Sequence, residues 1–599
     1  MSVMSNSIKP LKLENVLDPR LNAMDYVQDK IRFGVMKGTE NQNVTRLQAN
    51  SYSTSGINWS FNTQSENVLI DRRIYAQVQF QISFTGTSTV GQPLLALDGD
   101  APRAFPLASI TNSLKVTING TSVESQYSDN MLAMLRYNND FQLSQYDLSQ
   151  TPNYPDTYQN YADGVGAIRN PLASYGSSGD RLGRGSFQLD AITNPVSVDG
   201  VTPTTSIIKF TVVEPLIVSP LLYSCTNLEA GFIGVRNMSV QFNFVAGQLD
   251  RIWSHAINAG SNITSTNVQL GAGVTEPPVL SVTYLTPPLI DIGLKPKTAV
   301  YQYYKTDTNI NDMNVTLSSG ASQTFASNSM QVPSVPRSIF IYACLKNGDK
   351  NYTTTDSFFR INSISLQYLN TSGQFSSMNS HDLYSMSVKN GLQMSWTEWN
   401  GETSDIGAPA TFGLCGSVLK IDVDDLAIPS NLAPSVSVNS QLNYTINITN
   451  TNSSVNKSVQ LVTIFVYDGI MEIQDNNVVT QTDILNQYDV VKIRAKGEWV
   501  DYHSAKSLYG GNWFSKLASL GRKGFEGFKK TCDLSKQFGL GGASAGASAG
   551  AIVGGKRCPK GSRKECKKGG ELYLDEEMDQ EPLGGRMMSR AELKKRLMM

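Results

Sequence analysis

Residues 74–84 read Ile-Tyr-Ala-Gln-Val-Gln-Phe-Gln-Ile-Ser-Phe, with an apolar side chain at every second position. Successive side chains of a β-strand point to opposite faces, so this alternation predicts a long strand with one buried face. The same period recurs at 114–118, 240–244, 364–368, 419–423 and 444–448. Continuous apolar runs at 339–345 and 461–467 predict strands that are buried on both faces. The chain is therefore expected to be all-β.

A weak internal repeat relates these strands across two halves of the chain. Residues 70–75 resemble 335–340, residues 110–116 resemble 360–366, and residues 213–218 resemble 423–428. Two copies of one β-domain, meeting near the proline-bearing stretch 286–289, explain this shared order better than one large sheet. Chance resemblance among Asn/Ser-rich strands is the alternative. The offset shrinks from about 265 to about 210 residues, so the first copy is expected to have the longer loops, notably at 145–205.

Charge is scarce in this chain and unevenly distributed. Of its 599 residues 17% are charged, below the roughly 25% usual in soluble domains. Residues 1–502 hold 31 Lys/Arg against 41 Asp/Glu, whereas residues 503–570 hold 14 against 3. The sequence thus predicts an acidic body followed by a basic tail.

Targeting and anchoring segments are not indicated by the sequence. The first 20 residues lack the apolar stretch of a secretory signal, and no run of about 20 large apolar residues follows. None of the six cysteines has CxxC spacing, which argues against both a disulfide framework and a zinc site. We expect a protein without a transmembrane anchor, made in a reducing compartment.

The strand pattern stops near residue 502, and the tail that follows is expected to be flexible and partly helical. Residues 513–528 place apolar side chains near helical spacing among lysines, but their glycines weaken any isolated helix. A Gly/Ala/Ser-rich repeat at 541–546, a flexible linker by composition, then precedes a basic cluster. Such a cluster either binds nucleic acid through its phosphates or is a solvated arm, and a further alternative is that 513–528 disrupts membranes. The basic cluster consists of Lys556, Arg557, Lys560, Arg563, Lys564, Lys567 and Lys568.

Candidate catalytic and ligand-binding residues are few. The three histidines, His255, His381 and His503, lie far apart in sequence, so a catalytic triad or a histidine metal site has little material. Residues 550–556 have the glycine and lysine spacing of a phosphate-binding loop, but Arg557 stands where magnesium binding needs Ser or Thr. The sequence therefore predicts no catalytic residue, no metal site and no cofactor, in a protein that is not an enzyme.

Six short stretches carry a family resemblance when they are taken together. They are 103–112 (Arg-Ala-Phe-Pro-Leu-Ala-Ser-Ile-Thr-Asn), 158–161 (Tyr-Gln-Asn-Tyr), 170–172 (Asn-Pro-Leu), 251–255 (Arg-Ile-Trp-Ser-His), 396–401 (Trp-Thr-Glu-Trp-Asn-Gly) and 509–511 (Tyr-Gly-Gly). In this order they resemble the major capsid protein of Sputnik-type virophages and the related Polinton-like viruses, and residues 589–594 resemble the end of those proteins. The resemblance implies two tandem eight-stranded jelly-roll barrels, a double jelly roll.

The resemblance also implies an organisation and a function. Residues 1–30 would be an N-terminal arm, 31–290 the first jelly roll with long loops, 291–502 the second jelly roll, and 503–599 the tail. The expected function is that of a major capsid protein, whose homotrimers tile an icosahedral DNA-virus shell as pseudo-hexagonal capsomers. Implied partners are further copies of the chain, penton and minor capsid proteins, and viral DNA at the basic tail. The expected location is the virion, after synthesis in the host cytosol and assembly at the viral replication site.

Proteolytic processing is a further expectation from the resemblance. Viruses of this lineage resemble adenoviruses in encoding a cysteine protease that favours an aliphatic residue, any residue, and then Gly-Gly before the cut. That pattern fits cleavage between Gly511 and Asn512 and between Gly555 and Lys556. Flexible segments outside the strands are where proteases cut. The alternative is that these glycines form only a hinge and a linker.

Two other functions stay open at this point. A penton or minor capsid protein usually needs one jelly roll, and the paired motifs argue against it. A carbohydrate-binding or hydrolytic β-sandwich would need a clustered pair of carboxylates or a calcium-type Asp/Asn loop, and the sequence identifies neither.

Overall fold

The computed structural model describes residues 41–490 apart from 64, 66–67, 96–99, 138–154, 160, 162–188, 222–230, 256–259, 272, 287–297, 405–410, 430, 453–455, 475–476, 483–486 and 488–489. These described residues belong to one compact unit of the chain. The expected arm (1–30) and tail (503–599) lie outside them, as do the boundaries expected at 290 and 502. The division into domains therefore stays a prediction.

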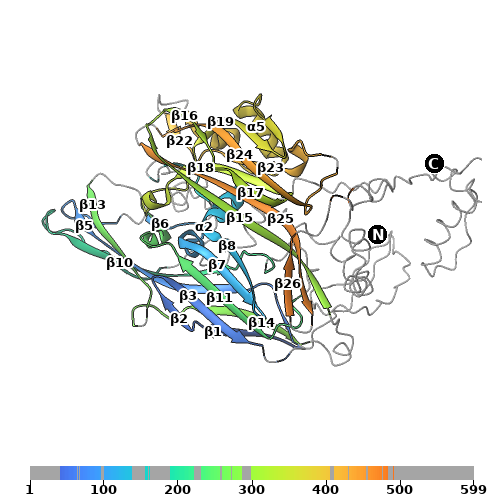
Figure 1. Cartoon of the computed structure of the whole chain (residues 1–599). Helices are drawn as coiled ribbons and strands as arrows, with labels where there is room; N and C mark the ends of the chain where they lie inside the picture. Colours follow the sequence, from blue (N-terminus) through green and yellow to red (C-terminus); the bar gives the residue numbers. More distant parts are fainter. Residues whose placement is uncertain are drawn as a thin grey trace, which may run out of the picture. The chain divides into compact units, whose positions relative to one another are not determined.

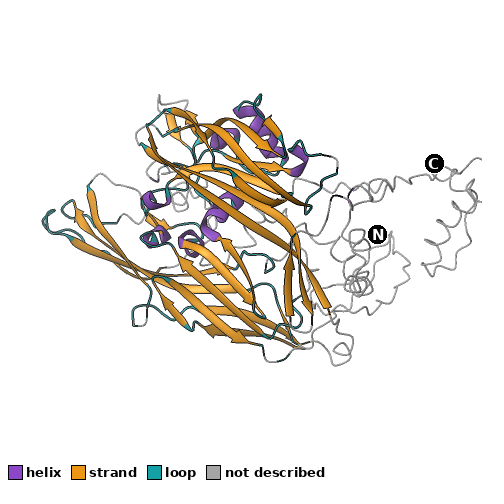
Figure 2. Ribbon diagram, in the orientation of Figure 1, coloured by secondary structure: helices purple, strands orange, loops and turns teal. Residues whose placement is uncertain are grey.

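The first part of the described chain forms two antiparallel sheets (Figures 1 and 2). In one sheet the order is β1-β14-β5-β10-β9, with β13 pairing with β5 and β4 with β14; in the other it is β2-β3-β11-β7-β8. The strands of the first sheet are β1 (Asn41–Gln48), β4 (Leu69–Ile70), β5 (Tyr75–Ser88), β9 (Leu189–Thr193), β10 (Thr204–Pro215), β13 (Ser261–Gln269) and β14 (Val279–Thr286). Those of the second are β2 (Ser51–Ser53), β3 (Gly56–Asn62), β7 (Thr111–Ile118), β8 (Thr121–Gln126) and β11 (Asn237–Phe244).

Eight of these strands pair in a nested order. Counted along the chain, they are β1, β3, β5, β7, β8, β10, β11 and β14. The first pairs with the eighth, the second with the seventh, the third with the sixth and the fourth with the fifth. A long antiparallel hairpin wound around a barrel has this order, which is that of a jelly roll.

The second part of the described chain repeats this arrangement. One sheet has the order β15-β25-β18-β23, with β26 pairing with β25, and the other has β16-β24-β19-β20, with β17 also pairing with β24. The nested pairs are β15 with β25, β16 and β17 with β24, β18 with β23, and β19 with β20. The strands are β15 (Thr298–Leu317), β16 (Ser322–Ala326), β17 (Met330–Ser334), β18 (Ser338–Leu345), β19 (Arg360–Tyr368), β20 (Thr371–Gln374), β23 (Val418–Asp422), β24 (Ser437–Thr449), β25 (Lys457–Gln474) and β26 (Asn477–Gln481).

The resembling stretches of sequence lie at equivalent strands of the two barrels. Residues 70–75 and 335–340 lead into β5 and β18, each the third strand of its barrel. Residues 110–116 and 360–366 lie in the fourth strands, and 213–218 and 423–428 lie at the ends of the sixth strands. The predicted double jelly roll of eight-stranded barrels is confirmed.

The strand predicted at 74–84 is β5, and its alternation is the reason for its burial. In β5 every second side chain is buried, and Ala76, Val78, Phe80, Ile82 and Phe84 are at most 1% exposed. The predicted runs at 339–345 and 461–467 lie in β18 and β25 and are buried on both faces almost throughout. Buried apolar residues of the two barrels make one continuous cluster, so the barrels share a core.

One predicted strand end is wrong. Residues 419–423 were expected to alternate through Val423, but β23 ends at Asp422 and Val423 begins a 3-10 helix, η5 (Val423–Asp425). The backbone N–H of Asp422 donates to the Asp425 carboxylate at 3.2 Å, which turns the chain out of the sheet.

Short elements occupy the connections between the strands (Figure 2). Within the described ranges they include two two-stranded sheets, β6 with β12 and β21 with β22, together with short α-helices and 3-10 turns. Among the described residues, no helix is both long and apolar enough to cross a bilayer. The elements are β6 (Asp100–Pro102), β12 (Trp253–His255), β21 (Glu402–Ser404), β22 (Thr411–Gly413), α1 (Pro106–Ile110), α2 (Tyr127–Met134), α5 (Ser380–Lys389), α6 (Trp396–Asn400), η3 (Leu249–Ile252) and η4 (Asn347–Asp349).

Candidate functional site

The histidines do not come together in the described structure. His255 is buried at the end of β12, where its Nδ1 lies 2.6 Å from Oδ1 of Asp100. His381 is exposed on α5 and packs on Trp396, with 4.8 Å between ring centroids. His503 lies outside the described residues. Within the described ranges no group of three His, Cys, Asp or Glu residues could hold a metal ion.

One serine and two cysteines in the described part of the chain were considered as catalytic nucleophiles. The hydroxyl of Ser254, beside His255, donates to the backbone carbonyl of Ala101 at 2.8 Å. Cys344 and Cys415 are free and buried. Burial raises the pKa of the Cys415 thiol to about 12 and also raises the pKa of the Cys344 thiol, so neither is a thiolate at neutral pH.

The predicted processing and tail residues lie beyond residue 490, outside the described part of the chain. The structure therefore neither brings them together nor separates them, and their roles stay predictions. They are Gly511, Asn512, Gly555, Lys556, Arg557, Lys560, Arg563, Lys564, Lys567 and Lys568.

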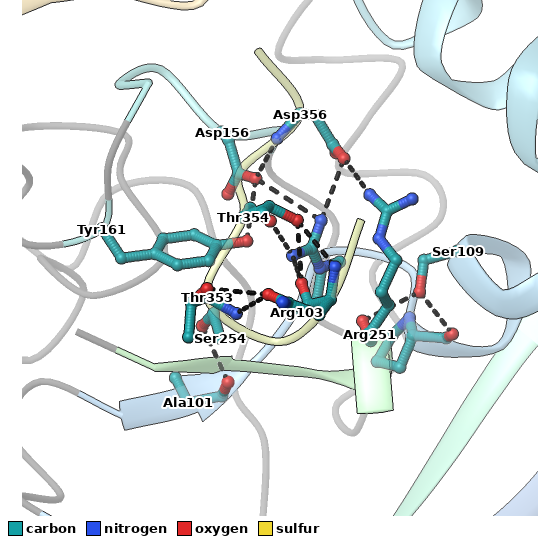
Figure 3. Close-up of polar contacts among 12 residues, drawn as sticks. Ala101, Arg103, Ser109, Asp156, Tyr161, Arg251, Ser254, Thr353, Thr354 and Asp356 are labelled. Carbon is teal, nitrogen blue, oxygen red and sulfur yellow. Dashed lines mark hydrogen bonds and ion pairs between the residues drawn. The ribbon is translucent and has the colours of Figure 1, made fainter. Parts of the chain in front are cut away.

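A buried cluster of charged side chains lies where the two barrels meet (Figure 3). Arg103 follows β6, Arg251 lies in η3, and Asp356 lies in the connection from β18 to β19. Oδ1 of Asp356 accepts from Nη1 of Arg103 at 2.9 Å and from Nη2 of Arg251 at 2.7 Å. Two arginines from the first barrel thus converge on one carboxylate from the second.

A second carboxylate, Asp156, completes this barrel junction from a connection between α2 and β9. Its Oδ2 accepts from the Asp356 backbone N–H at 3.0 Å and from the Tyr161 hydroxyl at 3.0 Å. Oδ2 also lies 3.9 Å from Nη1 of Arg103, whose side chain is wholly buried. Nη2 of Arg103 donates to the carbonyl of Thr354. Asp156 thus contacts residues of both barrels.

Burial and neighbouring charges shift the two carboxyls in opposite directions. Burial, together with the nearby Asp356 charge, raises the pKa of Asp156. Burial alone would also raise the pKa of Asp356, but Arg103, Arg251 and Arg136 outweigh it and lower this pKa. Asp356 is therefore the carboxylate that keeps its charge and pairs with the arginines.

Backbone and lysine contacts extend the barrel junction around this cluster. The Gln159 backbone N–H donates to the Gly413 carbonyl at 3.1 Å, so a first-barrel connection runs alongside β22. The buried Lys457 at the start of β25 donates to Oε1 of Gln159 at 3.0 Å and to the Ser357 hydroxyl at 2.8 Å. Burial lowers the pKa of Lys457 to about 7.

Aromatic side chains supply the apolar part of the barrel junction. Tyr137 meets Phe340 edge-on at 5.3 Å between ring centroids, and its hydroxyl donates to the Val418 carbonyl at 2.9 Å. Tyr342 of β18 donates to the carbonyl of Asp129 in α2 at 2.9 Å. A cavity of about 40 Å³ between α2, β8, β15 and β25 is smaller than the roughly 150 Å³ that admits benzene. These contacts of the barrel junction hold the two barrels together.

Part of this cluster lies in stretches that the sequence had already marked, although no role was predicted for its residues. Arg103, Tyr161 and Arg251 each stand in one of the stretches that carry the family resemblance, and the structure brings these stretches together. Asp156 and Asp356 were missed. The one available signal was their charge, in a chain where charged residues are scarce.

Comparison with known proteins agrees with this architecture. The family model "Sputnik virophage major capsid protein 1st domain" matches residues 15–285, and "Major capsid protein V20 C-terminal domain" matches residues 303–469. The putative capsid protein V20 of the Sputnik virophage is 30% identical over 546 residues, which cover 87% of this chain and 88% of that protein.

Two solved structures share the fold. A chain in the cryo-EM structure of the Sputnik virophage has a TM-score of 0.70 and 29% identity, and the match covers 85% of this chain and 100% of that chain. The mavirus major capsid protein has a TM-score of 0.60 at 15% identity, covering 81% of this chain and 99% of that chain, and supports the fold alone.

Two barrels of this kind, matched over nearly their whole length, define a double jelly-roll major capsid protein of a virus. This chain belongs to the Sputnik virophage major capsid protein family. It is accordingly a virophage major capsid protein and a component of the virion capsid.

Proposed function

We propose that three copies of this chain form a capsomer of six barrels, and that such capsomers tile an icosahedral DNA-virus shell as pseudo-hexagons. The observation that carries this proposal is the repeated nested pairing of strands, which gives one chain two barrels of like topology. Three copies around a closed three-fold axis present six like barrels, and six like units approximate a hexagon. The role is structural, and the chain is not an enzyme.

The barrel junction supports this role. A hexagonal outline needs the two barrels of a chain to act as one body, since a loose link would allow many outlines. The continuous apolar cluster and the buried pairing of Arg103 and Arg251 with Asp356 join the barrels in this way.

The test is the mass of the purified full-length chain in dilute native solution. We expect a stable trimer made of three 65.4 kDa chains. A monodisperse monomer would contradict it, and so would a dimer.

We assign the basic tail to the capsid interior, where it would contact viral DNA or internal proteins. The charge distribution supports this assignment. Residues 503–570 hold 14 Lys/Arg against 3 Asp/Glu, whereas residues 1–502 are acidic, so the tail is the part of the chain that attracts phosphates. Deleting residues 512–599 should leave trimers intact while reducing particle yield or genome packaging. Loss of trimers would instead make the tail part of the capsomer.

Processing by a viral cysteine protease, after Gly511 and after Gly555, would release this tail once it has guided assembly. Intact-mass spectrometry of protein from mature virions decides this, because cleaved chains end at Gly511 or Gly555. Virions that contain only full-length chains would rule it out. Penton and minor capsid proteins are the remaining proposed partners, synthesis is assigned to the host cytosol, and assembly to the viral replication site.

A further inference from the structure

One surface of the first barrel carries exposed apolar side chains and almost no charge. It lies where β5, β10 and β13 reach furthest to the left in Figure 1, and we call it the apex. The apex comprises residues 88–93 from the last residue of β5 onward, residues 194–203 before β10, and Gly260 before β13. Its exposed fractions are 59% for Val90, 55% for Val196, 87% for Val198 and 76% for Val201. Large apolar side chains this exposed and this close together mark an interaction site.

Hydrogen bonds between the three segments hold the apex in one shape. The Gly91 N–H donates to the Ser197 carbonyl at 2.8 Å, and the Ser197 N–H donates to the Gln92 carbonyl at 2.9 Å. The Thr89 N–H donates to the Gly260 carbonyl at 2.8 Å. Binding to such a surface costs little conformational entropy, because the backbone is already ordered.

The segments that carry the apex valines lie side by side. Val196 forms a β-bridge with Pro93, which joins the two long segments. A Cβ atom added to Gly200 would lie 3.1 Å from Cγ2 of Val90, so Val90 packs against the turn that carries Val198 and Val201.

Charge is almost absent from the apex. Asp199 is its single charged residue. This carboxylate is occupied within the turn, where it accepts from the Val201 N–H at 2.9 Å and from the Thr202 N–H at 2.8 Å. The Thr202 hydroxyl also donates to this carboxylate and has the largest effect on its pKa. Together with the two backbone hydrogen bonds it lowers the pKa of Asp199 to about 2.

We propose that the apex is a contact surface for a second copy of this chain within the capsomer, an inference that rests on the proposed homotrimer. Residues 1–502 carry 41 Asp/Glu against 31 Lys/Arg, so the net negative charge of this part of the chain disfavours the close approach of two copies. An uncharged apolar surface lets identical acidic chains touch without this cost. The apex combines both properties.

A lipid surface is the other occupant to consider for exposed valines. Protein surfaces that enter the lipid interface usually combine Lys or Arg with Trp, Phe or Leu. The apex segments have none of these residues. The second copy is therefore the better fit.

The experiment places like charges on the apex of the full-length chain. In the variant Val198→Glu with Val201→Glu, six new carboxylates enter the trimer. We expect the monomer–trimer midpoint in sedimentation equilibrium to rise at least about tenfold, because juxtaposed like charges are costly at an interface. The matched control is Val44→Glu with Val388→Glu, at valines that are 56% and 43% exposed outside the apex. The control midpoint should stay near that of the unmodified chain, and circular dichroism checks that both variants are folded.

Three other outcomes would contradict the apex contact. If the unmodified chain is a monomer at all concentrations, the homotrimer and the apex contact are both wrong. If it is a trimer and the apex variant keeps its midpoint, or both variants weaken the trimer equally, the apex contact alone is wrong. If the unmodified chain pellets with phosphatidylcholine vesicles and the apex variant does not, the apex is a lipid-binding surface and this inference is overturned.

Discussion

Asp356 is the residue at which the barrel junction can be tested most simply, because two buried arginines converge on its carboxylate. Asp356→Asn keeps the size of the side chain and removes its charge, which leaves Arg103 and Arg251 without their shared counter-ion. Breaking a buried ion pair in this way costs about 3 kcal/mol or more of unfolding free energy. Chemical denaturation followed by tryptophan fluorescence measures the loss.

The control for this change is an exposed ion pair. Lys305 and Asp307 lie 2.8 Å apart with side chains 42% and 41% exposed. Asp307→Asn should cost less than about 1 kcal/mol, since solvent screens such pairs. Equal losses at the two aspartates would mean that the buried cluster does not join the barrels.

Lys457 gives the barrel junction a dependence on pH. Burial lowers its pKa from 10.5 to about 7 in the folded chain. Between these values the unfolded chain binds a proton that the folded chain does not, so the free energy of unfolding rises with pH. The stability that neutral Lys457 contributes is fully present above the unfolded pKa of 10.5. It is lost as the pH falls through the folded pKa of about 7. Lys457→Met removes the titrating group and hence this slope.

The measurement is the difference in unfolding free energy between the unmodified chain and Lys457→Met from pH 7 to pH 9.5. We expect the difference to shift in favour of the unmodified chain as the pH rises. Lys305→Met, at a 42% exposed lysine, serves as the control. A difference that is flat with pH would show that Lys457 is charged in the folded chain.

The residues of the barrel junction show what the sequence could predict at this scale. Arg103 and Arg251 were visible because they stand in stretches that resemble a family. Their pairing with Asp356 was not, because Arg103 and Asp356 are 253 residues apart and one sequence holds no signal for a contact at that distance. Burial of a charge is likewise a property of the folded chain and has no local pattern.

At the scale of single elements, periodicity decided which strands were predicted. β5 buries one face and leaves the other half-buried, so its side chains alternate. β9 is exposed along most of its length and β13 buries only Val268, so neither shows a regular alternation of apolar residues and no strand was predicted for them. Tertiary pairing with β10 and β5, rather than a local pattern, makes them strands.

Gly86 tests how closely β13 pairs with β5. A Cβ atom at this position would lie 2.1 Å from the Asn262 carbonyl oxygen, so a side chain cannot enter without moving β13. Gly86→Val should cost about 1–3 kcal/mol of unfolding free energy, as overpacking does elsewhere. Faster hydrogen exchange of the β13 amides should accompany the loss.

Gly271 is the matched control for Gly86. No atom lies within 4 Å of a Cβ placed there, so Gly271→Ala should change stability little. Unchanged exchange of the β13 amides in Gly86→Val would contradict the pairing of these strands.

At the scale of the whole molecule, one chain carries the same nested barrel twice. The repeat in the sequence predicted two copies of one β-domain, because matching stretches of sequence lie at equivalent strands. The nested order itself was implied by the family resemblance and not by the pattern of residues, since periodicity identifies a strand without naming its partner. Duplication in one chain allows the two barrels to differ, and only the first carries the apex and the extra strands β9 and β13 among the described residues.

Two barrels of one chain would supply a third of a six-barrel capsomer. A cryo-EM reconstruction of the purified full-length protein, calculated without imposed symmetry, would show this arrangement. We expect three copies around one axis, with six barrels in a nearly hexagonal ring and the two barrels of each chain in contact through Arg103, Arg251 and Asp356. A particle with any other number of copies, or one in which the two barrels of a chain are separated, would contradict it.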